Sequence, residues 1–199
     1  MIDSIAKQFE KPKGVLGKLA GTVMYFENRK INKWSIRKLH VEKNDRILEI
    51  GYGPGYGIKT LMSSYGSILV DGIDLSDKMR DEATRRNKAW IETGKVHLTT
   101  GDVADYQPDH CYSKIISVNN YPLWEKPLIS LKRLYKLLES RGRIVLTVQP
   151  REEGSTDDTA KQLGEQMKED LLSTGFANPE ISFLKVRPGL TVCVTAEKK

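Results

Sequence analysis

Short apolar runs alternate with longer amphipathic stretches along most of this chain. The apolar runs have the length and composition of buried strands, whereas apolar residues in the intervening stretches recur at helical spacing. Strand-like runs occupy 46–50, 67–76, 95–99, 114–118 and 143–148, and helix-like stretches begin at 58 or occupy 77–93, 125–138 and 159–174. This alternation predicts an α/β domain with a parallel sheet.

The last part of the chain departs from the alternation. After a helix that stops at Gly175, two strand-like runs at 180–186 and 190–196 are separated only by Arg187-Pro188-Gly189. A Pro-Gly pair in so short a connection predicts a β-hairpin. Earlier, Ser140-Arg141-Gly142 predicts a turn between a helix and the strand at 143–148, and 149–158 is expected to be a polar loop near the same edge.

The N-terminal part has a different character. Glycines at 14, 17 and 21 make one long helix improbable over residues 1–28, so short helices or a mobile arm are expected there. A clearer helix begins at Asn28 and ends before the turn pair Asn44-Asp45. Its apolar side consists of Ile31, Trp34, Ile36 and Leu39, and its basic side consists of Arg29, Lys30, Lys33, Arg37 and Lys38.

Charge is concentrated in the same part. Residues 1–43 hold ten Lys or Arg and four acidic residues, which accounts for the whole net charge of +6. We therefore divide the chain into a basic helical cap or lid at 1–43 and a main domain at 44–199. The helix is interpreted either as packing Trp34 and Leu39 on the sheet, or as a lid whose basic face attracts an acidic substrate, a lipid headgroup or RNA.

Bulk properties narrow the classes of protein further. A chain of 199 residues with 39% hydrophobic and 29% charged residues is typical of a soluble globular domain with an appended segment. No apolar run is long enough for a transmembrane segment, and the N-terminus lacks the apolar centre of a secretory signal, so a cytoplasmic location is expected. Cys111 and Cys193 lie far apart and the histidines are scattered, so neither a disulfide nor a metal site is expected.

The first apolar run leads into the most informative stretch, Glu49-Ile50-Gly51-Tyr52-Gly53-Pro54-Gly55-Tyr56-Gly57. Glycine at alternate positions after a buried strand allows the backbone to approach a ligand closely, and the helix that follows places free N–H groups there. The nicotinamide fingerprint would need glycine at 56, and the phosphate-binding GxxxxGK[ST] loop does not match after Gly57. An ordinary tight turn is the alternative.

The pattern Glu-x-Gly-x-Gly-x-Gly resembles that of the class I S-adenosylmethionine-dependent methyltransferases, from about Asp45 to the C-terminus. The resemblance implies a Rossmann-like, doubly wound, seven-stranded and mostly parallel sheet whose last strand is antiparallel in a C-terminal hairpin. It also implies S-adenosyl-L-methionine as the cofactor.

Two later acidic residues fit this resemblance. Asp74 lies 23 residues after Gly51, close to the spacing at which a second strand offers a carboxylate to ribose hydroxyls. Its alternative role is to cap the helix near Ser76-Asp77. The resemblance implies that Leu75 lies against the adenine, and that Asp102 and the Val103 N–H bind the adenine edge, with Asp105 or a turn role as alternatives. The predicted cofactor-binding residues are Glu49, Gly51, Tyr52, Gly53, Gly55, Asp74, Leu75, Asp102, Val103 and Asn119.

The acceptor is expected beyond the carboxyl ends of the strands. Asn119-Asn120-Tyr121-Pro122 is distantly similar to the Asn-Pro-Pro-aromatic motif of enzymes that methylate amino groups of nucleic acids, but the double proline is missing and the aromatic residue comes one place early. A substrate wall, or turn and core packing, are the other interpretations. The predicted substrate residues are Tyr25, Asn28, Asn120, Tyr121 and Trp124, and no residue is placed well enough to be named as a general base.

The functional expectation is methyl transfer from S-adenosylmethionine to a small organic acceptor by in-line displacement. In this respect the chain resembles a broad group of enzymes that includes the ubiquinone- and menaquinone-type methyltransferases. One alternative is an RNA- or lipid-directed methyltransferase that docks through the basic N-terminal segment. Another is a non-catalytic module that binds the cofactor.

Overall fold

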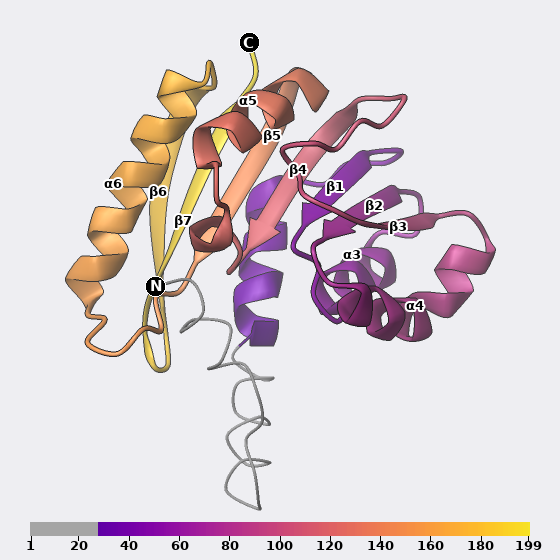
Figure 1. Ribbon diagram of the computed structural model, residues 1–199, viewed down its shortest axis with the longest axis horizontal. Helices are drawn as coiled ribbons and strands as arrows, with labels where there is room; N and C mark the ends of the chain where they lie inside the picture. Colours follow the sequence, from indigo (N-terminus) through magenta and orange to yellow (C-terminus); the bar gives the residue numbers. More distant parts are fainter. Residues whose placement is uncertain (1–27) are drawn as a thin grey trace, which may run out of the picture.

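The computed structural model describes residues 28–199, which form a seven-stranded mixed sheet with helices on both faces (Figure 1). The strand order is β3-β2-β1-β4-β5-β7-β6. The first five strands pair in parallel, and β7 is antiparallel to both β5 and β6. The strands are β1 (Arg46–Ile50), β2 (Leu69–Asp74), β3 (Val96–Thr100), β4 (Tyr112–Val118), β5 (Leu138–Val148), β6 (Ala177–Val186) and β7 (Gly189–Glu197). The predicted fold class and the C-terminal hairpin are confirmed.

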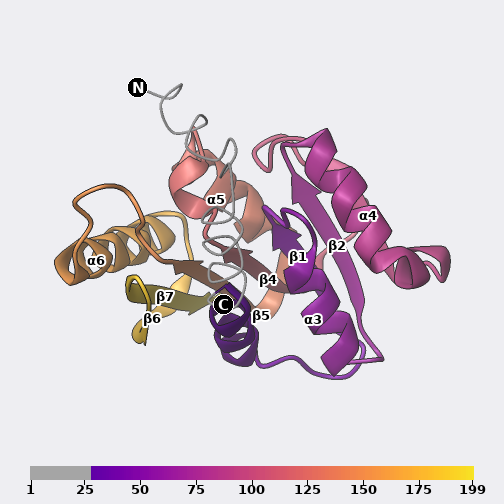
Figure 2. The ribbon, with the colours of Figure 1, turned by 90° about the horizontal axis from the view of Figure 1, so that it is seen from below.

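The helices divide between the two faces of the sheet. They are a helix described over 28–39, α3 (Tyr56–Ser64), α4 (Asp77–Glu92), the short η1 (Tyr121–Leu123), α5 (Pro127–Leu137) and α6 (Asp157–Ser173). The helix at 28–39 and α3 lie on one side of the sheet, and α5 and α6 lie on the other (Figure 2). Two hydrophobic clusters fill these interfaces. One contains Leu131 and Met167 from α5 and α6, and the other contains Leu39, Leu61 and Ala83.

The helix at 28–39 is an integral part of the core. Ile31 and Leu39 are fully buried. The Ser35 hydroxyl bonds the Thr147 hydroxyl of β5 at 2.8 Å, and Lys38 Nζ donates to the Ser182 hydroxyl of β6 at 2.9 Å. The apolar side predicted from the sequence therefore packs on the sheet, as the first interpretation of this helix expects. The rest of the predicted cap, residues 1–27, lies outside the described residues.

The turn predicted at Ser140–Gly142 is wrong. These residues belong to β5, which begins at Leu138. Tyr112 pairs with Leu138 and Lys114 pairs with Arg143, so β5 carries extra residues in an irregular stretch opposite β4. The Arg141 N–H donates to the Lys198 carbonyl at 2.8 Å, and the Lys198 N–H donates to the Gly142 carbonyl at 3.0 Å. The C-terminal end of the chain thus supplies the backbone partners that keep this segment in the sheet.

One half of the sheet has a helical layer on a single side. The connection from β3 to β4 is a loop without a helix, and this loop crosses the side of β1 and β2 that faces away from α3 (Figure 1). The polar strand residues on this side are therefore not covered by a helix: Asp71 is buried and lies against His110 of the β3–β4 loop, whereas His97 is exposed. Within residues 28–199, no helix is long and apolar enough to cross a membrane.

Candidate functional site

Four strand ends bring the predicted cofactor-binding residues to one edge of the sheet. The strands β3, β2, β1 and β4 are adjacent and parallel, so the residues that follow them are neighbours in space. The Gly51 N–H donates to the Ile73 carbonyl at 2.8 Å, and the Gly101 N–H donates to the Asp74 carbonyl at 2.9 Å. The chain order reverses between β2 and β4, on either side of β1, which is where open α/β sheets bind ligands.

The glycine loop after β1 is built on left-handed backbone. Gly51, Gly53 and Gly55 have φ values of 68°, 51° and 79°. A β-carbon built on Gly55 would lie 2.5 Å from Asn87 Nδ2, whereas one built on Gly53 would meet no atom of residues 28–199 within 4 Å beyond its chain neighbours. Gly55 is therefore required by packing, and the backbone at Gly53 faces open space that a ligand can enter.

Helix α4 holds this loop in place through residues that the sequence analysis missed. The Asn87 side-chain amide donates to the Gly55 carbonyl at 3.1 Å, and Arg86 Nη1 donates to the Pro54 carbonyl. The Arg86 guanidinium also lies 3.7 Å from the centre of the Tyr56 ring. A signal existed in the sequence, because the fully buried Asn87 interrupts the apolar stripe of α4 one turn after Ala83.

Asp74 connects the end of β2 to the glycine loop. Its Oδ2 accepts from the Gly53 N–H at 2.8 Å, and its Oδ1 accepts from the Ser76 N–H at 2.9 Å. The N-cap of α4 is Ser76, whose hydroxyl accepts from the Met79 N–H at 3.3 Å, so Asp74 is not the cap. Each carboxylate oxygen keeps a lone pair that can accept a further hydrogen bond. Leu75, the next residue, is 67% exposed and offers an apolar surface beside this carboxylate.

Glu49 is a buried carboxyl group behind the loop. Its side chain comes so close to Gly57 that a β-carbon there would be 2.2 Å from Glu49 Oε1. Its Oε2 has no hydrogen-bond partner among the described residues. Burial, and secondarily the negative charge of Asp74, raises the pKa of the Glu49 carboxyl to about 8. A cationic donor placed against Oε2 would favour the ionised form.

The remaining predicted cofactor residues contribute in different ways. The Tyr52 side chain is buried in the core and donates to the Thr99 carbonyl at 3.2 Å, so only its backbone lies in the loop. Asp102 Oδ1 accepts from the Ala104 N–H at 2.8 Å, which orients this carboxylate in a turn after β3. Val103 is buried against the core. Asp102 is partly buried while Asp105 is exposed, so Asp102 is the better placed of the two.

The residues after β4 are divided between the loop and the core. Asn120 Oδ1 accepts from the Trp124 indole N–H at 2.6 Å, and the Asn120 side chain covers Gly51. Asn119 Oδ1 accepts from the Gln149 N–H at 2.8 Å. Tyr121 is buried, its hydroxyl donates to Asp170 of α6, and burial together with this bond raises its pKa. Asn120 and Trp124 therefore lie beside the glycine loop, and the Tyr121 hydroxyl does not.

Asn28 joins the same edge from the N-terminal side. Its side-chain oxygen accepts from Arg151 Nη2 at 3.0 Å, and Arg151 Nη2 also bonds Gln149 Oε1 at 2.7 Å. Since Gln149 directly follows β5, Asn28 lies near the residues that follow the strands. Tyr25 is outside the described residues. Within residues 28–199, no group of three or more His, Cys, Asp or Glu side chains is placed to hold a metal ion.

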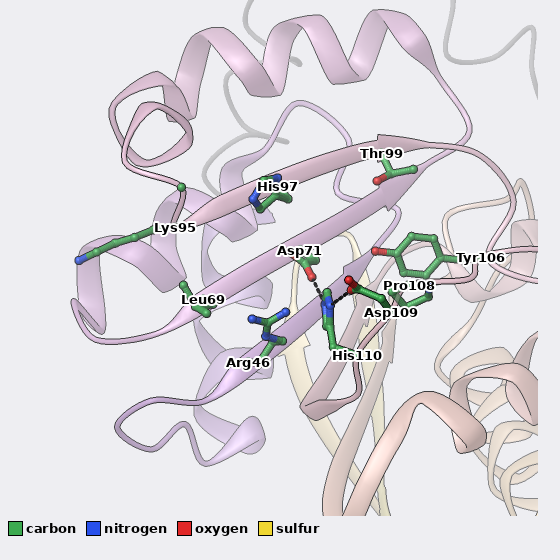
Figure 3. A pocket seen from close by; sticks show the side chains of 11 residues that line it. Arg46, Leu69, Asp71, Lys95, His97, Thr99, Tyr106, Pro108, Asp109 and His110 are labelled. Carbon is green, nitrogen blue, oxygen red and sulfur yellow. Dashed lines mark hydrogen bonds and ion pairs between the residues drawn. The ribbon is translucent and has the colours of Figure 1, made fainter.

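A separate hollow of about 640 Å³ opens on the half-sheet beneath the β3–β4 loop (Figure 3). Asp71 Oδ2 accepts there from the Tyr112 hydroxyl at 2.9 Å and lies 2.7 Å from His110 Nε2, while His110 Nδ1 lies 2.6 Å from Asp109 Oδ1. This network provides partners for the buried carboxylate of Asp71. None of the predicted site residues lines this hollow, which starts at the first residues of β1 and β2 rather than after the last ones.

Comparison with known proteins gives a consistent result. Residues 47–142 match a family model described as a methyltransferase domain. The chain is 35% identical over 181 residues to the uncharacterized methyltransferase YdaC of Bacillus subtilis, covering 90% of this chain and 98% of that protein. The alignment with this relative reaches well beyond residues 47–142 on both sides.

Solved structures share the fold at lower identity. Phosphoethanolamine N-methyltransferase 2 of Haemonchus contortus, solved with phosphomonomethylethanolamine and S-adenosylhomocysteine, superposes with a TM-score of 0.69 at 18% identity over 84% of this chain; the chain spans about half of that protein, 52%. The N-methyltransferase NodS of Bradyrhizobium japonicum, solved with S-adenosylhomocysteine, gives a TM-score of 0.70 at 15% identity, covering 86% of this chain and 87% of NodS. With its fold, its glycine loop and a 35% identical methyltransferase relative matched over nearly its whole length, the chain belongs to the class I S-adenosylmethionine-dependent methyltransferase family.

Proposed function

We propose that this protein transfers a methyl group from S-adenosylmethionine to a small organic acceptor. One observation carries the cofactor half of the proposal: open backbone at Gly53 lies directly against the Asp74 carboxylate, with the exposed Leu75 next to it. A nucleoside needs this combination, because its ribose hydroxyls are donors and its base is a flat apolar surface.

The described residues fit the cofactor at both ends. Asp74 would accept from the ribose hydroxyls, Leu75 would contact the adenine face and Asp102 would accept from the adenine amino group. The unpartnered Glu49 Oε2 is a buried acceptor without a donor among residues 28–199, and the ammonium group of the cofactor is a donor of the required kind. When bound, S-adenosylmethionine supplies a methyl group that its sulfonium has already activated.

The remaining task of the protein is to position the acceptor and exclude water. Asn120 and Trp124 form a hydrogen-bonded pair over Gly51, and we assign them to the acceptor wall together with Asn28. Tyr25, which is outside the described residues, is assigned to the same wall from the sequence alone. Of the cap predicted at 1–43, the helix at 28–39 packs on the sheet, so the proposed cover of this wall is confined to the residues before it. The acceptor that we propose is a small organic molecule, of the size handled by ubiquinone- and menaquinone-type enzymes.

Turnover with a labelled methyl group tests the proposal. The protein is incubated with S-adenosylmethionine carrying a labelled methyl group and a cell extract, which is then separated into small molecules, lipids and RNA. Label is expected in the small-molecule fraction, and at limiting S-adenosylmethionine Asp74→Ala should transfer much less label than the exposed matched control Asp81→Ala. Label in RNA or lipid would overturn the acceptor class. Cofactor binding by calorimetry without any transfer of label would instead identify a binding module.

A further inference from the structure

A second groove, of about 500 Å³, lies between the helix at 28–39 and the end of β6. Its walls carry five cationic side chains and the aliphatic side chains of Leu184 and Val186. The cations are Lys30, Lys33, Arg37, Lys185 and Arg187. Among residues 28–199, no carboxylate lines the groove, and we call it the basic groove.

The two walls each arise from local structure. Lys30, Lys33 and Arg37 follow one another at spacings of three and four residues, so they share one exposed face of the helix. Lys185 and Arg187 lie at the tip of the C-terminal hairpin, where β6 ends at Val186. Because the opposite face of the helix packs on the sheet, its basic face is held next to the hairpin.

The positive charge of the groove is nearly uncompensated. In the part of the chain that the structure describes, the one carboxylate within ion-pair distance of these five cations is Asp157, whose Oδ2 lies 3.8 Å from Lys185 Nζ. Like charges brought together by folding repel one another, and the repulsion is relieved when an anion binds between them. The groove is thus arranged for a multiply charged anion, and the Arg37 and Arg187 guanidinium groups can bind phosphate oxygens in pairs.

Hydrogen bonds of Gln149 connect the groove to the edge of the sheet that holds the glycine loop. Gln149 Nε2 donates to the carbonyls of Val186, at 2.6 Å, and Gly189, at 3.1 Å, while the Gln149 N–H donates to Asn119 Oδ1 at 2.8 Å. One residue therefore bonds both the hairpin tip and the loop after β4. A ligand in the groove would therefore lie near the edge of the sheet at which the methyl acceptor is expected.

Size and surrounding charge favour a small ligand over a polymer. A volume of about 500 Å³ is within the range of small-molecule sites. Beyond the hairpin tip, Asp157 accepts from the Leu190 N–H at 3.1 Å and is followed by Asp158, and the preceding loop carries Glu152 and Glu153. These carboxylates would repel an extended polyanion that left the groove on this side. We propose that the basic groove binds the phosphate group of a small phosphorylated ligand.

Titration with inorganic pyrophosphate, without S-adenosylmethionine, tests this proposal independently of methyl transfer. Calorimetry at low salt is expected to detect binding that weakens as salt is added. The variant Lys33→Gln/Arg37→Gln should weaken binding by about tenfold or more, since it removes two charge-assisted contacts. Lys185→Gln/Arg187→Gln, on the other wall, should have a similar effect. The exposed α5 pair Lys132→Gln/Lys136→Gln removes the same charge and should leave affinity unchanged.

Amide chemical shifts locate the bound anion. Pyrophosphate should shift the signals of residues 30–37 and 184–187, and thermal unfolding should show that all variants remain folded. The proposal is overturned if pyrophosphate does not bind, if the α5 control loses affinity equally, or if the shifts map elsewhere. It is also overturned if a single-stranded RNA or vesicles containing phosphatidylglycerol bind the groove and pyrophosphate does not compete, because the ligand would then be a macromolecule or a membrane.

Discussion

The side chain of Asn120 covers the α-carbon of Gly51: a β-carbon on Gly51 would lie 2.2 Å from Asn120 Cγ. Position 51 therefore requires glycine, because Asn120, which follows the neighbouring strand β4, fills the space that a β-carbon would need. Since Asn120 also bonds Trp124, the expected cofactor loop and the expected acceptor wall are in direct contact. A substitution at Gly51 or at Asn120 should therefore affect both the cofactor loop and the acceptor wall.

Gly51→Ala is accordingly expected to destabilise the protein more than Gly53→Ala. Both residues have positive φ, at 68° and 51°, so each alanine carries a left-handed strain of roughly 1–2 kcal/mol. Only Gly51→Ala adds an overlap with Asn120. Chemical denaturation measures both losses, and Asn120→Gly in the Gly51→Ala background should recover part of the larger one. Equal losses for the two alanine variants would contradict the observed contact.

Gly53→Ala should nevertheless abolish or strongly weaken S-adenosylmethionine binding, because its methyl group would occupy the space that we assign to the cofactor. Gly94→Ala is the matched control. Gly94 has a φ of 69°, also has open space around its β-carbon position, and lies after α4, away from the loop. Calorimetric titration should show full affinity for Gly94→Ala and a loss for Gly53→Ala. Retained affinity in Gly53→Ala would remove this backbone from the cofactor site.

Asp74→Ala should weaken S-adenosylmethionine binding by about 1–3 kcal/mol, since it removes the proposed acceptor for ribose hydroxyls and releases the Gly53 N–H. Asp81→Ala, which removes an exposed carboxylate from α4, controls for the change of net charge. The binding constants of the two variants are compared with that of the wild type by calorimetry. If Asp74→Ala binds as well as Asp81→Ala, the ribose assignment is wrong.

Glu49→Gln should stabilise the ligand-free protein increasingly as pH rises. The pKa of Glu49 is raised to about 8 in the fold from 4.5, so between these values the folded state keeps a proton that the unfolded state has released. The contribution of the carboxyl is fully present below pH 4.5 and is lost as pH rises to 8. Glutamine remains neutral throughout. The difference in melting temperature should therefore grow from pH 5 to pH 8, and a constant difference would refute the raised pKa.

Tyr121→Phe should affect stability but not the binding of S-adenosylmethionine. The Tyr121 hydroxyl donates to Asp170 of α6, whereas the glycine loop contacts its neighbour Asn120. Losing this bond should lower the free energy of unfolding by about 1 kcal/mol. The double variant with Asp170→Asn tests whether the two losses are coupled, as contact requires. A drop in cofactor affinity comparable to that of Asp74→Ala would place Tyr121 in the site instead.

Most of the fold could be predicted because its signals are local. The strand at 46–50, the helix stop at Gly175 and the Pro-Gly hairpin each depend on residues within a few positions of one another. The prediction of a turn at Ser140–Gly142 was wrong because the backbone partner of this segment, Lys198, is at the far end of the chain. A Ser-Arg-Gly sequence is typical of a turn until another strand end pairs with it.

The site was predictable for groups that are expected to meet the ligand directly and much less so for groups that support them. The glycines are indicated by the Glu-x-Gly-x-Gly-x-Gly motif, and Asp74 is indicated by its spacing of 23 residues from Gly51. Arg86 and Asn87 act on the loop from 32 residues away, and only the polar interruption of an apolar stripe indicated that Asn87 had a partner. Likewise, nothing in Asn119-Asn120-Tyr121-Pro122 reveals that the tyrosine bonds a residue of α6, because that pairing exists only after the sheet has formed.

The loop that replaces a helix between β3 and β4 has a mechanical consequence. Strands β1 to β3 are braced by helices on one side, whereas β4 and β5 are braced on both, so the half that presents Asp74 and Asp102 should open at lower free energy. A nucleoside spanning these two carboxylates would bridge the ends of β2 and β3 and act as the missing brace. Occupancy of the site would then tighten the very strands that create it.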